Sequence, residues 1–172
     1  NVSIEQAARI TQVLPEQILP VGVFVDKPYD DILRIVNECG LGGVQLHGSE
    51  PPDMVDRLLD KDLFVIKALF AKKEPFLEQA DRYHMASSLL VEYGKGTLPG
   101  GNAESWNYEI SRRIKTDVPI VLAGGLDPDT VSDALKSADP AGVDVSSGVE
   151  KSPGVKDVEK VRKFIETVRT VI

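Results

Sequence analysis

The chain has 172 residues and a mass of 18.7 kDa, which suits a single domain spanning residues 1–172 and is too small for two large domains. With 42% hydrophobic and 27% charged residues, the composition excludes a disordered or low-complexity chain. The net charge of −7 argues against a general nucleic-acid binder or a protein of anionic membrane surfaces, although a small basic pocket could still hold phosphate.

Cysteine and hydropathy patterns narrow the class further. The single cysteine, Cys39, excludes an internal disulfide and predicts a reducing, cytoplasmic compartment. No apolar run approaches the roughly 18 residues of a membrane helix, and no signal peptide is visible. Residue 1 is Asn rather than Met, so we expect that the printed sequence is not an intact translation product.

Six apolar segments rich in β-branched residues predict strands. Most are almost continuously apolar, which is typical of strands buried on both faces of a parallel sheet. Their starts are spaced by 22, 21, 25, 31 and 22 residues, so a βα unit of about 24 residues repeats along the chain. The segments are Val21–Asp26, Gly43–Gly48, Phe64–Leu69, Leu89–Tyr93, Ile120–Gly125 and Gly142–Ser147.

Helical periodicity separates several of these strands. Apolar residues at helical spacing predict helices over Asp30–Asn37, Pro52–Leu59, Asp129–Lys136 and Lys156–Val171. Asp127-Pro128 is a typical helix start, with a capping side chain before a proline at the first helical position, and residues 49–52 are a similar start. Two architectures fit this repeat: an open doubly wound sheet and a closed (β/α)8 barrel. The first strand is not followed by G-x-G-x-x-G, which disfavours the dinucleotide-binding version of the open sheet.

Polar and glycine residues gather where the predicted strands end. A single such residue is explained by a strand reaching water, but the set together predicts a site, because parallel α/β proteins bind ligands at the carboxyl ends of their strands. The residues at these ends are Asp26, Gln45, His47, Lys67, Glu92, Gly124, Gly125, Asp144, Ser146, Ser147 and Gly148.

Two glycine-containing loops, Gly124-Gly125 and Ser147-Gly148, predict a phosphate site. Glycine lets backbone N–H groups approach an anion closely, and the partial positive charge of a helix N-terminus favours it further. Loops after the last two strands are also the usual phosphate site of (β/α)8 enzymes. The alternative is a pair of ordinary glycine-rich turns.

Glu92 is the candidate for acid–base chemistry. It ends a strand and precedes a glycine-rich loop over residues 94–102, which could close over a substrate. An exposed glutamate beside a linker is the alternative. His47 either contacts substrate or supports a neighbouring group, and Lys67 either forms a Schiff base or pairs with an adjacent carboxylate, the pairing being favoured.

The remaining reactive residues suggest no further centre. His84 lies in a polar stretch and is expected at the surface, and it is far in sequence from His47, so no metal site is predicted. Cys39 is expected at a helix C-terminus, away from the strand ends, as a structural thiol.

Several motifs occur in the order of one known family. They are VGVFV at 21–25, VQLHG at 44–48, VIKA at 65–68, Gly100-Gly101 with an aromatic residue at Trp106, LAGGL at 122–126, and VDVSSGVE at 143–150 followed by Pro153-Gly154 and Lys156-Asp157. On these residues the chain resembles the phosphoribosylanthranilate isomerase family of tryptophan biosynthesis. The resemblance covers essentially the whole sequence.

The resemblance implies a (β/α)8 barrel and a cofactor-free Amadori rearrangement of a small phosphorylated substrate by a monomer or homodimer. The family's general acid falls on Glu92, where the family usually has aspartate. The phosphate grip falls on Gly124, Gly125, Ser147 and Gly148, and Asp144 falls on a residue near the substrate amine. Gln45 and His47 are expected near the substrate. Where the family has a glycine-serine/threonine-glycine run, this chain has Gly-Asn-Ala at residues 101–103.

The resemblance also implies an absence. The family's barrel opens with a strand that carries the catalytic cysteine base, then a helix, a second strand and an arginine-bearing loop, and nothing in residues 1–172 matches them. Ser3–Leu14 then corresponds to the second helix, and the chain is expected to supply helix 2 and βα units 3–8. We expect the N-terminal segment in the same polypeptide or as a separate chain.

Three alternatives stay open at this stage. The chain could be a non-catalytic module that binds a phosphorylated ligand, or an engineered fragment of the same barrel. It could also be a related phosphosugar barrel, such as an indole-glycerol-phosphate synthase or a ribulose-phosphate epimerase, although the latter needs His/Asp metal ligands that two distant histidines do not easily supply.

Overall fold

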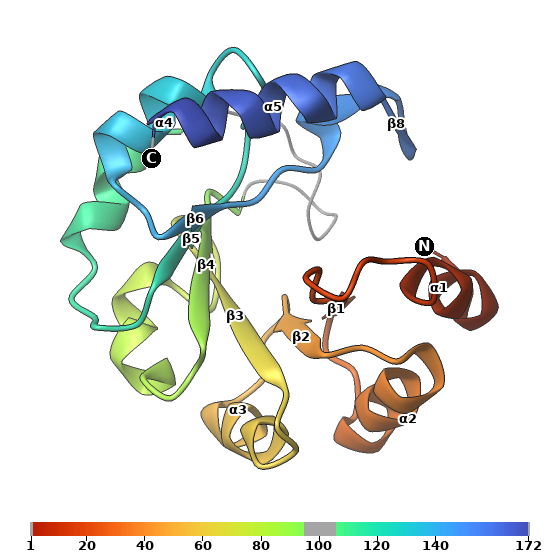
Figure 1. Cartoon of the computed structure of the whole chain (residues 1–172). Helices are drawn as coiled ribbons and strands as arrows, with labels where there is room; N and C mark the ends of the chain where they lie inside the picture. Colours follow the sequence, from red (N-terminus) through yellow and green to blue (C-terminus); the bar gives the residue numbers. More distant parts are fainter. Residues whose placement is uncertain (1, 95–105, 172) are drawn as a thin grey trace.

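The computed structural model describes residues 2–94 and 106–171 and forms one parallel α/β unit (Figure 1). The glycine-rich loop expected over residues 94–102 lies outside the described residues, apart from Gly94. The strands are β1 (Val21–Phe24), β2 (Gly43–Leu46), β3 (Phe64–Phe70), β4 (Ser88–Glu92), β5 (Ile120–Leu122) and β6 (Gly142–Val143). The α-helices are α1 (Ile4–Thr11), α2 (Tyr29–Cys39), α3 (Pro52–Leu59), α4 (Val131–Ala138) and α5 (Val158–Val171). Three short 3₁₀ segments, η1 (Leu77–Tyr83), η2 (Tyr108–Arg113) and η3 (Ser147–Val149), and a hairpin of β7 (Glu150–Ser152) and β8 (Val155–Lys156) complete the chain.

The sheet has the strand order β1-β2-β3-β4-β5-β6, and every pair is parallel. A doubly wound sheet reverses its strand order at a switch point, whereas a barrel adds each new strand on the same side. The sequential order therefore favours the barrel type over the open doubly wound sheet. The helices follow one another around the outside of the strands, with α1 and α5 at the two ends of the arc (Figure 1).

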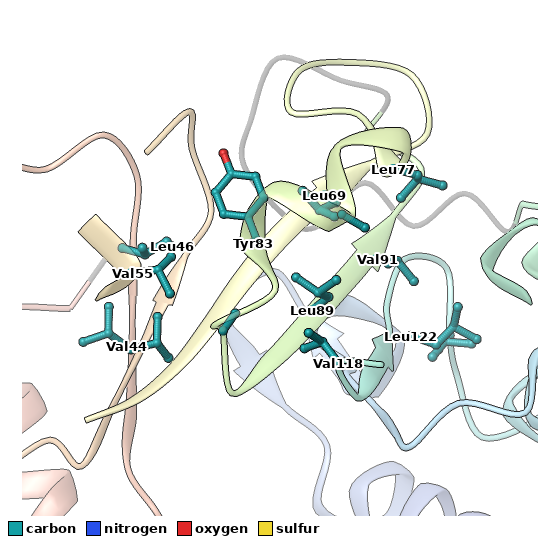
Figure 2. Packing of buried hydrophobic residues seen from close by; sticks show 14 of the residues in the cluster. Val44, Leu46, Val55, Leu69, Leu77, Tyr83, Leu89, Val91, Val118 and Leu122 are labelled. Atoms are coloured by element: carbon teal, nitrogen blue, oxygen red, sulfur yellow. The ribbon is translucent and has the colours of Figure 1, made fainter. Parts of the chain in front are cut away.

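The two faces of the sheet differ in what they pack against. Val44, Leu46, Leu69, Leu89, Val91 and Leu122 are buried together with residues of the helices (Figure 2). The alternate residues of the central strands form a second, smaller cluster of Ala68, Phe70, Leu90 and Ala123. Because side chains alternate between faces along a strand, the first set faces the helices and the second faces the inside of the arc. We call these the outer and inner faces.

Local chemistry explains where the helices begin and end. Ser3 caps α1, since its Oγ accepts from the Gln6 N–H at 3.2 Å while the Gln6 side chain accepts from the Ser3 N–H. Helix α2 ends at Cys39, and the Gly40 that follows has a φ of 61°, the left-handed conformation that glycine adopts without strain. Within the described part of the chain, no helix is long and apolar enough to cross a membrane.

Several predicted boundaries were wrong. Helix α4 begins at Val131, two residues after the predicted start. The capping role of Asp127 is confirmed, because its Oδ1 accepts from the backbone N–H groups of Asp129 and Thr130 and its carbonyl oxygen accepts from the Val131 N–H. No side chain caps α3, which has Pro51 at its N-cap position. The 3₁₀ segments η1 and η2, where a regular βα unit would have full helices, were not predicted.

Candidate active site

Glu92, His47 and Gln45 meet on the inner face at the carboxyl ends of β4 and β2. Glu92 is the last residue of β4, and His47 follows the last residue of β2. Because side chains alternate between the two faces of a strand, Glu92 and His47 face the same side as Phe70 and Leu90, which is the inner face. The rings of His47 and Phe70 meet edge to face, with their centroids 5.3 Å apart. The His47 Nε2 atom lies 3.3 Å from the Glu92 Oε2 atom, and both side chains are buried.

Gln45 favours one tautomer of the His47 imidazole. Its Nε2 amide nitrogen lies 3.0 Å from His47 Nδ1 and donates to it. A neutral imidazole that accepts at Nδ1 carries its proton on Nε2, which is the nitrogen facing Glu92. The Nε2 atom is buried, yet its alignment with Glu92 is not that of a hydrogen bond and no other group in residues 2–94 or 106–171 accepts from it. A buried donor without an aligned acceptor is available to a ligand.

Asp144 adds a second carboxyl group to this region. It follows β6, and its side chain reaches solvent while many protein atoms still surround it. Desolvation by these atoms raises the pKa of Asp144, and the negative charge of Glu92 raises it further, whereas His47 and Lys156 act in the opposite direction. Asp144, Glu92 and His47 therefore form one electrostatically linked group.

The glycine loop after β5 lies directly beside Glu92. A Cβ atom on Gly124 would come within 3.1 Å of Glu92 Cγ and 3.4 Å of Trp106 Nε1. Gly124 and Gly125 have φ angles of 87° and 68°, both in the left-handed region. Any other residue at position 124 would have a strained backbone conformation and a Cβ atom crowded against the Glu92 side chain, so glycine is the residue that fits.

The loop after β6 closes against the same segment. A Cβ atom on Gly148 would overlap the carbonyl oxygen of Leu126, so the two loops are in backbone contact. Ser147 is the first residue of η3, next to Gly148. Gly124 thus lies beside Glu92, and Gly148 contacts the same loop two residues further along, at Leu126.

Lys67 points the other way. Its place in β3 alternates with Ala68 and Phe70, and its Nζ is fully buried, 2.8 Å from Glu50 Oε2 and 2.7 Å from the Gly48 carbonyl oxygen. The expected ion pair is confirmed. Burial lowers the pKa of Lys67, and the charge of Glu50 opposes this effect. Including Lys67 among the residues that converge at the strand ends was wrong, because odd and even positions of one strand face opposite layers.

Glu50 is a buried residue that sequence reasoning missed. Its carboxylate accepts from the backbone N–H of Asp26 at 2.9 Å and of Gly48 at 3.0 Å, besides pairing with Lys67. Asp26 in turn accepts from the Ser49 N–H at 2.7 Å. These contacts join the loops after β1 and β2. Asp26 is therefore held as part of the framework and not with Glu92.

The other reactive residues lie elsewhere. Cys39 is buried at the C-terminus of α2, and its Sγ lies 3.6 Å from the Ile4 carbonyl oxygen, as expected for a structural thiol. His84 is exposed and lies 3.1 Å from the Asp81 carbonyl oxygen. Among the described residues, no group of three or more His, Cys, Asp or Glu side chains is arranged to hold a metal ion.

Comparison with known proteins decides the family. A sequence model described as N-(5'-phosphoribosyl)anthranilate (PRA) isomerase matches residues 1–167. The chain belongs to this isomerase family. It is 46% identical over 160 residues to the N-(5'-phosphoribosyl)anthranilate isomerase of Desulfatibacillum aliphaticivorans, a match that covers 93% of this chain and 73% of that protein. It is thus an isomerase of tryptophan biosynthesis.

Solved structures of the family share the fold. The phosphoribosyl anthranilate isomerase of Thermus thermophilus superposes with a TM-score of 0.85 at 32% identity, covering 100% of this chain and 82% of that one. A second family structure, in complex with reduced 1-(o-carboxyphenylamino)-1-deoxyribulose 5-phosphate, gives a TM-score of 0.80 at 32% identity, covering 98% of this chain and 80% of that one. The six-stranded parallel sheet is therefore of the family's barrel type.

Proposed function

We propose that this chain converts N-(5'-phosphoribosyl)anthranilate to 1-(2-carboxyphenylamino)-1-deoxyribulose 5-phosphate with Glu92 as the general acid. The observation that carries this assignment is the buried carboxyl group of Glu92 at the end of β4, beside His47 and next to the Gly124 loop. General acid catalysis needs a carboxyl group within reach of the substrate and shielded from water; the burial of Glu92 and its place at the carboxyl end of β4 support this role.

The order of proton transfers gives each group a task. Glu92 gives its proton to the ribose ring oxygen as the C1–O bond breaks, which leaves an open-chain Schiff base. A base then removes the C2 proton, and the resulting enolamine rearranges to the ketone. His47 is proposed to turn its Nε2–H toward the Glu92 carboxylate once the Glu92 proton has left, since Nε2 lies 3.3 Å from Glu92 Oε2 without being aligned as a donor to it.

The phosphate group is assigned to the loops after β5 and β6. Backbone N–H groups of Gly124, Gly125 and Gly148 are the donors, and Ser147 adds a hydroxyl. Support comes from the contact between the two loops and from the positive φ angles of the two successive glycines, a conformation in which consecutive N–H groups can converge on an anion. Asp144 and Gln45 are placed near the remainder of the substrate.

The base and the first two strands of the barrel are proposed to come from an N-terminal segment outside residues 1–172, in the same polypeptide or as a separate chain. The chain spans 73% to 82% of the relatives described above. Residues of α1 and β1, the edge strand of the sheet, line an apolar groove of about 1080 Å³. Two of these residues, Val23 and Ile10, are 61% and 53% exposed. Adding the family's first strand and helix should cover this groove and restore turnover, measured with the chain alone as the reference.

Glu92→Gln tests the acid. In the enzyme supplied with its base, this variant should lower kcat by about 10² or more, the scale of general acid–base contributions. Glu38→Gln, on the exposed face of α2 and paired with Arg34, is the matched control and should leave kcat unchanged. Glu92→Asp should be tolerated or improve turnover, since it keeps the carboxyl group. Normal turnover of Glu92→Gln would remove Glu92 from this role.

A reducing, cytoplasmic location and a monomeric or homodimeric state stay predictions. The single cysteine and the family membership support them.

A further inference from the structure

Two aromatic side chains hold the backbone of the glycine loop after β5. The Trp106 Nε1–H donates to the Ala123 carbonyl oxygen at 3.0 Å, and the Tyr108 hydroxyl donates to the Gly124 carbonyl oxygen at 2.9 Å. Both donors belong to the segment at the start of η2, and their rings meet edge to face at 5.4 Å. Two consecutive carbonyl groups of the loop are thus held by neighbouring side chains.

The geometry of the peptide bond links each held carbonyl group to the direction of the N–H group that follows it. In a planar trans peptide the C=O and the following N–H point in opposite directions. Fixing the Ala123 carbonyl therefore fixes the direction of the Gly124 N–H, and fixing the Gly124 carbonyl fixes that of the Gly125 N–H. In an extended chain successive carbonyls alternate in direction, but the φ of 87° at Gly124 departs from that geometry.

Among the described residues, the two N–H groups that this arrangement orients have no acceptor. Within residues 2–94 and 106–171, neither the Gly124 N–H nor the Gly125 N–H donates to a protein acceptor. Successive N–H groups directed to one side form an anion-binding concavity. In this structure, the concavity depends on the aromatic donors behind it.

The side chains of Trp106 and Tyr108 both act as hydrogen-bond donors to the loop. The indole N–H can only donate, so Trp106 cannot hold the loop with its carbonyl reversed. Burial raises the pKa of Tyr108, and the charge of Asp127 adds to this effect, so the phenol keeps its proton. Trp106 and Tyr108 are 8% and 9% exposed, so water does not readily replace them.

We infer that Trp106 and Tyr108 are positioning residues for the substrate phosphate: by holding two carbonyl groups from behind, they direct the N–H groups of Gly124 and Gly125 at the phosphate oxygens. This role rests on the proposed placement of the phosphate at Gly124 and Gly125. It adds two side chains that do not touch the substrate but determine how strongly its charged end is bound.

The test separates phosphate binding from the rest of the ligand. Reduced 1-(o-carboxyphenylamino)-1-deoxyribulose 5-phosphate and its dephosphorylated counterpart are titrated calorimetrically into the enzyme. Tyr108→Phe and Trp106→Phe each remove one donor and keep a ring. Each should weaken binding of the phosphorylated ligand by about three- to tenfold, the size of one net hydrogen bond, and leave the dephosphorylated ligand unaffected.

Tyr83→Phe is the matched control. Tyr83 is also buried, and its hydroxyl also donates to a backbone carbonyl, that of Glu50 at 3.1 Å, but it lies in η1 behind the outer face. It should change thermal stability without changing the preference for the phosphorylated ligand. Comparing the three variants separates a positioning effect from a general loss of stability, which would weaken both ligands together.

The outcomes distinguish this inference from the proposed phosphate site. If the unmodified enzyme shows no preference for the phosphorylated ligand, the phosphate site is wrong and the positioning role falls with it. If Gly124→Ala removes the preference while Tyr108→Phe and Trp106→Phe keep it, the phosphate site stands and the role of the two aromatic residues is overturned. A selective loss in both aromatic variants supports the inference.

Discussion

The His47 imidazole and the Glu92 carboxylate lie 3.3 Å apart in a buried part of the inner face, between β2 and β4. Gln45 lies behind the imidazole and directs the proton of the ring toward the carboxylate. The three residues come from two strands that are not neighbours in the sheet, with Phe70 of β3 against the imidazole. Glu92, the proposed general acid, is therefore held beside side chains of β3 and of the β2 end.

Gln45→Met should disturb this arrangement without touching Glu92. Methionine fills a similar volume but cannot donate to Nδ1, so the imidazole proton is no longer directed to Nε2. We expect kcat to fall by about tenfold, a fraction of the general acid contribution, and the pH dependence of kcat to shift, with KM little changed. Gln79→Met, which loses only an exposed contact to the Phe76 N–H, is the control. An unchanged pH profile would contradict the role of Gln45.

The apolar runs in the sequence predict where the strands of this site lie, but not which face of the sheet each residue occupies. The six apolar runs locate the six strands of the parallel sheet and their polar ends, because a buried parallel strand is apolar on both faces, whereas the β7–β8 hairpin was not predicted. The same property hides which face each residue occupies. Lys67 and Glu92 both sit in apolar runs, yet Lys67 faces the helices and Glu92 faces the inside, and only the register of the sheet separates them.

Contacts made by loop residues could not be predicted from the sequence, because no periodic pattern relates the residues that meet. Glu50 looked like part of a helix start, but its carboxylate joins the loops after β1 and β2. Tyr108 is 16 residues from the carbonyl that it holds. No periodicity relates such pairs, since they meet only after the sheet has formed. The segments η1 and η2 were missed because each is too short to display a helical repeat.

Lys67→Met should be strongly destabilising. The variant leaves the Glu50 carboxylate buried and without its cation, and breaking one side of a buried ion pair typically costs about 3–5 kcal/mol of unfolding free energy. Adding Glu50→Gln should recover part of this loss, because the amide oxygen can still accept from the Asp26 or Gly48 N–H. Urea denaturation of the single and double variants measures both effects.

An exposed ion pair provides the comparison for Lys67. Lys163 pairs with Asp129 at 2.6 Å, but the two side chains are 60% and 78% exposed. Lys163→Met should therefore cost less than about 1 kcal/mol. If Lys67→Met proved as mild as Lys163→Met, the Lys67–Glu50 pair would not be the buried framework contact described here.

Gly148→Ala should disrupt the contact between the two loops. The added methyl group would overlap the Leu126 carbonyl oxygen, so the backbone of one loop must move. We expect weaker binding of phosphorylated ligands and a loss of about 1–3 kcal/mol in stability, as for other overpacked sites. Gly142→Ala is the control, because its methyl group would meet only Val121 Cγ2 at an ordinary 3.6 Å. Equal behaviour of the two variants in ligand titration and thermal unfolding would refute the close approach at Gly148.

Asp144→Asn should stabilise the fold in a pH-dependent way. Because surrounding protein atoms, and then the charge of Glu92, raise the pKa of Asp144, the native state binds its proton more tightly than the unfolded chain does. Between the unfolded and folded pKa values the unfolded state binds fewer protons, so the contribution of this group to stability falls as the pH rises and stays unfavourable at neutral pH. Asparagine removes the charge, so the melting temperature should rise at pH 7, and the gain should vanish below about pH 4, where aspartate is protonated in both states. Asp133→Asn, on α4, is the control, and an equal gain at both pH values would show that charge burial at Asp144 is not the cause.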